Sequence, residues 1–179
     1  MKPVRITYFV HGTTTDNEKG LASGWNDVGL SELGKKQSMK LKSQIKMKPD
    51  AVFCSDLKRA VDSAKLIFGF GIIRDKRLRE INYGSLTGAD SRKVDPLMSS
   101  HISKPFPDGE SYRDVEARLR SFLDDLSRKY PGKHVAIVSH RAPQLALEVL
   151  LKGKTWQQAM KEDWRLRKEW KPGWEYLLE

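Results

Sequence analysis

The chain has 179 residues, of which 39% are hydrophobic and 31% charged, and this balance excludes a disordered or fibrous protein and fits one globular domain. Its one cysteine, Cys54, excludes an internal disulfide framework, and no apolar run approaches the roughly 20 residues that a membrane helix needs. The net charge of +10 favours anionic partners, although charge alone does not choose among phosphorylated metabolites, nucleotides, nucleic acid and acidic membrane surfaces.

The start of the chain, MKPVRITYFVHG, has neither the long apolar stretch nor the small-residue cleavage site of a signal peptide. The single cysteine also fits a reducing compartment. We therefore expect a cytoplasmic protein that does not span a membrane.

Four short stretches have the apolar and β-branched composition of buried strands, and each is bounded by Pro, Gly, Asp or Lys. They span residues 4–10, 51–54, 71–74 and 134–139. Helical periodicity follows the first two: Ser31 can cap a helix that carries Leu33 and Leu41 on one face, and Asp56 can cap the next.

A third helix is predicted from about residue 110 to 130, and a fourth begins near residue 142. Strands that alternate with helices predict an α/β fold: a single three-layer domain over residues 1–179, with a mostly parallel central sheet and helices on both faces.

Two regions break this alternation, and we expect both to shape the entrance of the pocket. Residues 81–109 are rich in Gly, Asp, Ser and Pro and have poor periodicity, which is typical of an active-site loop. The tail, residues 154–179, carries four tryptophans among many charges. It predicts a helix that packs its tryptophans on the body and an edge strand at 173–178, with an amphipathic membrane helix as the alternative.

Chemically useful side chains follow three of the predicted strands. His11 follows the first, Arg59 lies just beyond the second, and His140 and Arg141 follow the last. Because ligands of open α/β sheets bind beyond the carboxyl ends of the strands, we expect these residues to gather at one edge. Glu80, at the opening of the long loop, can join them.

This set of groups suits phosphoryl transfer. A neutral imidazole such as His11 is a competent nucleophile near neutral pH, and Arg59 offers a planar fork of donors for phosphate oxygens. His140 can donate a hydrogen bond to the transferring group, and Glu80 can act as acid and then as base. Taken singly, each residue also has a plain structural reading, so the joint placement carries the prediction.

Ordered sequence blocks resemble the histidine phosphatase superfamily, the phosphoglycerate mutase-like proteins, over residues 4–150. The family signature Arg-His-Gly appears here as Val10-His11-Gly12. The later blocks are SGWND at 23–27, LSELGKKQ at 30–37, SDLKRA at 55–60, LREINYG at 78–84, PDGES at 107–111 and VSH at 138–140.

The resemblance implies that His11 is phosphorylated and then hydrolysed, that Arg59 and His140 hold the phosphoryl group, and that Glu80 is the acid and base. It also implies that a small phosphorylated substrate contacts Gly12, Asn17, Ser23 and Gly24. No metal and no cofactor is expected, and the four histidines and one cysteine form no ligand-spaced cluster.

Two positions depart from the family pattern. Val10 stands where the family has an arginine that binds the phosphate, and Arg141 stands where it usually has a glycine. We therefore hypothesise that Arg141 replaces the missing positive charge, with Lys19 as a less favoured substitute. The alternative is that Arg141 is a structural residue.

The sequence leaves several functions open. A metal-independent phosphomonoester hydrolase is the main prediction, and a catalytically weakened phosphate-binding protein of the same fold is the rival, because the arginine is missing. Mutases of the family typically carry longer insertions around the site, and because this chain is short, hydrolysis is favoured over mutase activity. The scattered basic residues include no nucleic-acid motif, so a nucleic-acid partner is not expected. The chain can be a monomer or a homodimer.

Overall fold

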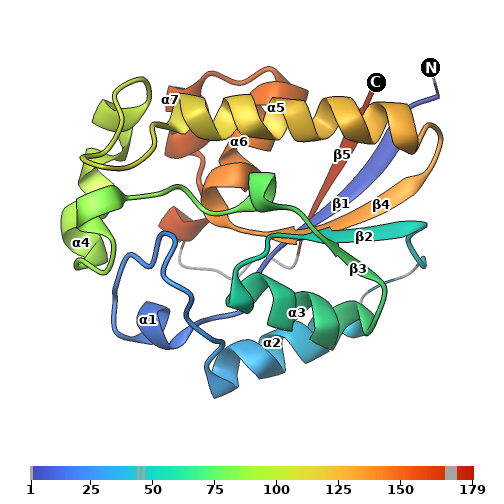
Figure 1. The fold of residues 1–179 in the computed structure, drawn as a ribbon, viewed down its shortest axis with the longest axis horizontal. Helices are drawn as coiled ribbons and strands as arrows, with labels where there is room; N and C mark the ends of the chain where they lie inside the picture. The colour runs from blue at the N-terminus through green and yellow to red at the C-terminus, as the bar shows by residue number, and fades with distance from the viewer. Residues whose placement is uncertain (1, 44, 46, 168–172) are drawn as a thin grey trace.

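The computed structural model describes residues 2–43, 45, 47–167 and 173–179, and it contains one five-stranded sheet with the strand order β3-β2-β4-β1-β5 (Figure 1). The strands are β1 (Val4–Val10), β2 (Ala51–Cys54), β3 (Ile72–Arg74), β4 (His134–Ser139) and β5 (Trp174–Leu178). The first four are parallel, and β5 pairs with β1 in the antiparallel direction. The predicted mostly parallel sheet and the predicted edge strand of the tail are confirmed.

Helices cover both faces of this sheet, as the sequence predicted (Figure 1). On one face lie α2 (Glu32–Lys42) and α3 (Lys58–Phe68), and on the other lie α5 (Tyr112–Lys129), α6 (Arg141–Lys152) and α7 (Trp156–Lys161). Each face has its own apolar cluster: Phe9, Val52 and Val138 pack towards α2 and α3, while Ile6, Val135 and Ile137 lie in the larger cluster towards α5 and α6.

The ends of α2 and α3 test the predicted caps. Ser31 caps α2 as predicted, since its side chain accepts a hydrogen bond from the Gly34 amide at 3.2 Å. Leu33, predicted to face inward, is 51% exposed. The predicted Asp56 cap of α3 is wrong, because the Asp56 carboxylate instead pairs with the Arg79 guanidinium at 2.7 Å.

The region 81–109 is more ordered than the predicted loop. It contains short helical turns, η2 (Gly84–Leu86), α4 (Ser91–Val94) and η3 (Asp95–His101). Val94, Met98 and Phe106 from this region are buried in the core. Together with the buried Ile102 they recur at every fourth residue, a spacing that the prediction of an irregular loop overlooked among the Gly, Asp, Ser and Pro residues of this region.

The tail packs on the body, but not as one continuous helix. After α7 comes the turn η4 (Trp164–Arg167), and then β5. Trp156 is buried and its indole donates a hydrogen bond to Glu116 at 2.7 Å, while Trp170 lies outside the described residues. In the part of the chain that the structure describes, no helix is long and apolar enough to cross a membrane.

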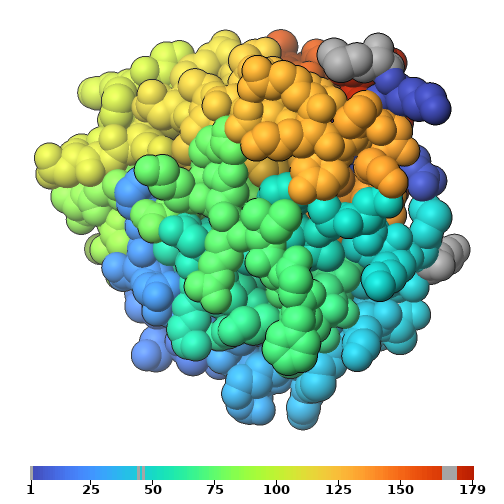
Figure 2. Space-filling model, turned by 45° about the vertical axis from the view of Figure 1, so that its right-hand side comes forward, coloured from blue at the N-terminus to red at the C-terminus, as the bar shows by residue number. Residues whose placement is uncertain are grey.

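The β3 edge of the sheet lies at the surface. In the space-filling view, residues of this region (green) lie between the end of α5 above (orange) and the segments around β2 and α3 below (cyan) (Figure 2). Ile73 is 42% exposed there. This edge runs along the side of the molecule, whereas the carboxyl ends of β1, β2 and β4 converge on the site described next.

Candidate active site

A pocket lies beyond the carboxyl ends of β1, β2 and β4, where the sequence predicted a site. Its wall combines residues from the first loops, α3, the region 81–109 and the tail. The lining residues are His11, Asn17, Leu21, Ala22, Ser23, Gly24, Arg59, Glu80, Tyr83, Ser91, Asp95 and Arg165. The structure therefore brings together six of the nine predicted site residues on one pocket, and a seventh, His140, lies beside His11.

The tautomer of His11 is fixed by the main chain. Its Nδ1 lies 2.7 Å from the Gly12 carbonyl oxygen, which can only accept a hydrogen bond, so Nδ1 carries the proton. Burial, followed by the charge of Arg59, lowers the pKa of His11 to about 3. At neutral pH the ring is uncharged, and Nε2 carries an electron pair that accepts a hydrogen bond from Arg59.

Arg59 is a buried cation next to this electron pair. Its Nε donates towards His11 Nε2 at 3.3 Å, and its two terminal nitrogens donate to the carbonyl oxygens of Asn26 at 2.8 Å and Gly24 at 2.6 Å. Only 2% of Arg59 is exposed. A guanidinium has five N–H groups, so two of them remain for a ligand.

The ring of His140 packs edge-on against that of His11, with 5.0 Å between the ring centroids. Its main chain is fixed by the Tyr8 hydroxyl, which donates to the His140 carbonyl at 2.6 Å. Burial is the first cause of a His140 pKa well below the ordinary value, followed by the nearby Arg59 and His11.

Three buried polar atoms of the site have no hydrogen-bond partner among the described residues. They are both ring nitrogens of His140 and the Ser23 hydroxyl oxygen. An unpaired buried polar atom costs on the order of 1–3 kcal/mol, and native structures contain few of them. A ligand rich in oxygen atoms would supply the missing partners.

The Glu80 carboxylate is held by three main-chain amides. Oε1 accepts from Ile81 at 2.9 Å and from Ala142 at 3.0 Å, and Oε2 accepts from Arg141 at 3.2 Å. The last two amides begin α6. Glu80 is therefore fixed at the pocket by the same helix that follows His140.

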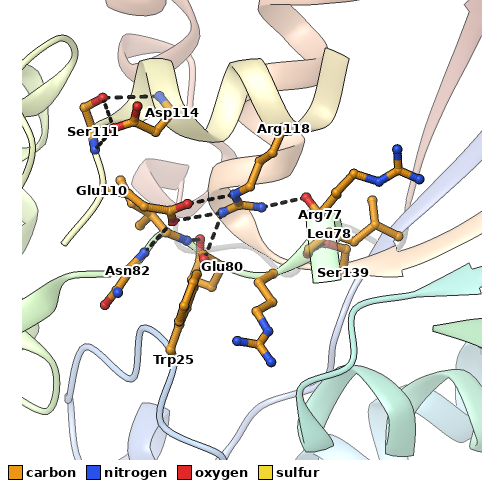
Figure 3. Close-up of polar contacts among 12 residues, drawn as sticks. Trp25, Arg77, Leu78, Glu80, Asn82, Glu110, Ser111, Asp114, Arg118 and Ser139 are labelled. Carbon is orange, nitrogen blue, oxygen red and sulfur yellow. Dashed lines mark hydrogen bonds and ion pairs between the residues drawn. The ribbon is translucent and has the colours of Figure 1, made fainter. Parts of the chain in front are cut away.

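Arg118 of α5 supports the segment that carries Glu80 (Figure 3). Its guanidinium donates to the main-chain carbonyls of Arg77 at 2.6 Å and Glu80 at 3.0 Å, and it pairs with Glu110 at 2.9 Å. The Trp25 indole also donates to the Glu80 carbonyl at 2.7 Å. No sequence feature distinguishes Arg118, since it is an ordinary polar position on an amphipathic helix.

Gly12 is needed because it has no side chain and so leaves room for α2. A Cβ at Gly12 would lie 2.3 Å from the Gly34 carbonyl oxygen, and a Cβ at Gly34 would lie 1.9 Å from that of Thr13. Two glycines thus let α2 approach the segment after His11 closely. The Gly12 amide donates to the Ser63 hydroxyl at 3.0 Å, so the structure gives Gly12 a packing contact rather than a place on the pocket wall.

Arg141 does not supply a free positive charge. Its Nε donates to Asp163 at 2.5 Å and its Nη1 to Asp95 at 2.8 Å. Two carboxylates therefore neutralise the guanidinium, and the side chain lines a neighbouring hollow instead of the pocket around His11. The hypothesis that Arg141 replaces the charge missing at Val10 is not supported by this geometry.

The structure adds pocket residues that the sequence analysis missed, among them Tyr83, Ser91, Asp95 and Arg165. The first three come from the region 81–109 and the last from the tail, the two regions that were expected to shape the entrance. The irregular sequence of these regions predicted that they shape the pocket entrance, but it did not predict which of their residues line the pocket.

The chain belongs to the histidine phosphatase superfamily (branch 1), whose family model matches residues 8–172. The resemblance predicted from the sequence blocks is thereby confirmed. Two histidines, an arginine and a carboxylate around one pocket agree with that membership.

Individual relatives carry two kinds of name. The chain is 34% identical over 173 residues to a 2,3-bisphosphoglycerate-dependent phosphoglycerate mutase of Chelativorans sp. (strain BNC1), with 84% of this chain and 82% of the relative covered. It is 32% identical over 161 residues to a putative phosphoserine phosphatase 2 of Hydrogenobacter thermophilus, with coverages of 83% and 79%. A solved mycobacterial glucosyl-3-phosphoglycerate phosphatase in complex with VO3 is 27% identical, with a TM-score of 0.79 over 88% of this chain and 86% of that chain.

Proposed function

We propose that the protein hydrolyses phosphomonoesters through a phosphorylated His11. The observation that carries this proposal is the state of His11: the ring is neutral, its proton is held on Nδ1, and the electron pair of Nε2 faces the Arg59 guanidinium. A neutral imidazole held in one tautomer is a nucleophile that needs no further activation.

The reaction has two displacements at phosphorus. In the first, His11 Nε2 forms a bond to phosphorus while the ester P–O bond breaks, and the leaving oxygen takes a proton from the Glu80 carboxyl group. In the second, the Glu80 carboxylate takes a proton from water, the water oxygen bonds to phosphorus, and the P–N bond breaks. Inorganic phosphate leaves, and Nε2 regains its electron pair.

The remaining groups stabilise the phosphoryl oxygens. The two free N–H groups of Arg59 supply charge, and His140 and Ser23 supply partners from their unpaired atoms. Such fixed donors act mainly by stabilising the charge of the transition state. The substrate class that this arrangement suits is a small phosphorylated metabolite.

Phosphoryl transfer of the mutase type is the second candidate, because several of the relatives carry that name. Hydrolysis is favoured by the phosphatase names of other relatives and of the solved structure. Conversion of 3-phosphoglycerate to the 2-phospho isomer, followed by ³¹P NMR with and without 2,3-bisphosphoglycerate, separates the two: a mutase interconverts the isomers, whereas a phosphatase releases inorganic phosphate.

The direct test is hydrolysis of p-nitrophenyl phosphate in EDTA, with His11→Gln beside the wild type. We expect the variant to lose on the order of 10⁴-fold or more in turnover, because no other group replaces the nucleophile. Rapid quenching of the wild type in alkali, followed by mass spectrometry, should show an acid-labile phosphate on His11. Wild-type turnover that survives in His11→Gln would refute the mechanism, and saturable phosphate binding without turnover would favour a non-catalytic binder.

A further inference from the structure

A second free cation in the pocket would favour the binding of a phosphoryl group. The described lining residues include two carboxylates, Glu80 and Asp95, and two guanidiniums, Arg59 and Arg165. Both histidines of the site are uncharged at neutral pH, because burial lowers their pKa values. A phosphoryl group brings up to two further negative charges, and the buried Arg59 already donates three hydrogen bonds to the protein.

Arg165 of η4 is placed to supply this cation. It lines the same pocket as His11, although it lies 154 positions further along the chain. Its charge is close enough to contribute to the lowered pKa of His11 and to oppose the rise that burial causes in the pKa of Tyr83. Among the described residues, no ion pair and no hydrogen bond involves its side chain.

Asp163 fixes the main chain of this residue. Its Oδ1 accepts a hydrogen bond from the Arg165 amide at 3.0 Å, and its Oδ2 accepts from Arg141 Nε at 2.5 Å. Asp163 itself is 1% exposed. Arg141 is therefore a positioning residue: it holds the carboxylate that starts η4, and it connects the tail to Asp95 of the region 81–109.

We propose that Arg165, delivered by the tail, binds an oxygen of the substrate's phosphoryl group and is the second phosphate-binding guanidinium of the pocket. The proposal rests on the proposed function for the nature of the ligand. It also explains why Val10 needs no charge: the guanidinium expected beside His11 in sequence arrives from the tail. Arg141 does not bind the phosphoryl group itself; it holds Asp163, which in turn holds the main chain of Arg165.

The test measures two quantities in Arg165→Met, namely kcat/KM for p-nitrophenyl phosphate and the inhibition constant of inorganic phosphate. Loss of one charge-assisted hydrogen bond should lower kcat/KM by about 10- to 100-fold and weaken phosphate by a similar factor. Arg165→Lys keeps the charge but not the fork, and should recover part of both losses. The matched control is Lys161→Met, which removes one positive charge from the same tail but does not line this pocket.

Each outcome decides the proposal. If Arg165→Met stays within twofold of the wild type in both quantities, Arg165 does not bind the phosphoryl group. A fall in kcat/KM with an unchanged phosphate constant overturns the proposal as well, since it shows a role outside phosphate binding. Should the wild type bind phosphate but hydrolyse nothing, calorimetric titration of Arg165→Met and Lys161→Met with inorganic phosphate still tests Arg165, while the hydrolase function alone fails.

Discussion

The two sides of the pocket are built in different ways. The pocket floor, which we define as His11, Arg59, Glu80 and His140, is held by main-chain amides and carbonyls. The pocket wall, which we define as the lining residues Asp95 and Arg165 with their supports Arg141 and Asp163, is held by carboxylates that accept from guanidiniums and from a turn amide.

The difference separates chemistry from selectivity. The main-chain partners of the floor come from Gly12 after β1, from Gly24 and Asn26 in the first loop, from Ile81 and from the start of α6, so the backbone itself fixes the reacting groups. The wall joins the region 81–109 to the tail through side chains, and side chains can be exchanged without changing the fold. We infer that the floor defines the phosphoryl reaction, and that the wall adjusts which phosphate ester enters.

Loss of Arg59 should cause the largest effect in this comparison. Arg59→Met removes the buried charge beside His11 Nε2 and leaves two carbonyl oxygens, of Gly24 and Asn26, without their donor. Removal of one preorganised donor costs about 10²–10³ in kcat, equivalent to about 2.7–4 kcal/mol. Steady-state hydrolysis of p-nitrophenyl phosphate measures this loss.

The control for Arg59→Met is Arg128→Met, which removes an exposed guanidinium that pairs with Asp125 on α5. It should keep wild-type turnover and a similar thermal unfolding midpoint. If Arg59→Met loses less than tenfold while it remains folded, the floor does not depend on this cation, and the distinction between floor and wall fails.

The buried neutral histidines of the floor predict a pH-dependent stability. His11 has a pKa of about 3 in the folded protein and about 6.5 in the unfolded chain. Between these values the unfolded state binds a proton that the folded state does not, so the free energy of unfolding decreases as the pH falls. From pH 6.5 to 5 the shifted pKa of His11 lowers the free energy of unfolding by up to about 2 kcal/mol.

Urea unfolding at pH 7, 6 and 5 measures this slope. The variant His11→Gln cannot take up the proton, so its stability should fall less steeply over the same range. Identical slopes for the two proteins would show that the folded His11 titrates like an exposed histidine, and would remove the argument that burial keeps the nucleophile neutral.

The sequence predicted the positions of three floor residues because each follows a predicted strand, whereas Glu80 was expected only from the opening of the long loop. Periodic strands and helices locate His11, Arg59 and His140 through one topological rule, that the carboxyl ends of parallel strands meet at one edge. The same regularity predicted the layers of the fold and the Ser31 cap of α2. Asp56 is an exception, because a local cap competes there with a distant guanidinium, that of Arg79.

The wall could not be predicted residue by residue. Arg165, Asp163 and Asp95 come from short turns without periodicity, and their pairing with Arg141 depends on how two irregular segments pack. A charge in such a segment reads as an ordinary surface charge. The sequence departure at Arg141 did point to this region, but the neighbouring carboxylates that decide its role are 46 and 22 positions away.

The smallest expected effect concerns Asp95, at the outer end of the wall. Its side chain is 41% exposed, and it pairs with Arg141 while it lines the pocket. Because partly exposed ion pairs contribute about 0–1 kcal/mol, Asp95→Asn should change the free energy of unfolding by no more than that. It also removes a negative charge near an anionic substrate, so KM should fall by about two- to fivefold, equivalent to about 0.4–1 kcal/mol.

The comparison variant is Asp90→Asn, whose carboxylate pairs with the exposed Arg92 and does not line the pocket, and its KM should stay unchanged. Chemical denaturation and steady-state kinetics on both variants give the two quantities. A KM that rises in Asp95→Asn would mean that this carboxylate holds Arg141 and the tail in place for the substrate, rather than opposing its charge. In that case Asp95 would act with the positioning groups of the wall, and the selectivity of the pocket would depend on Arg165 alone.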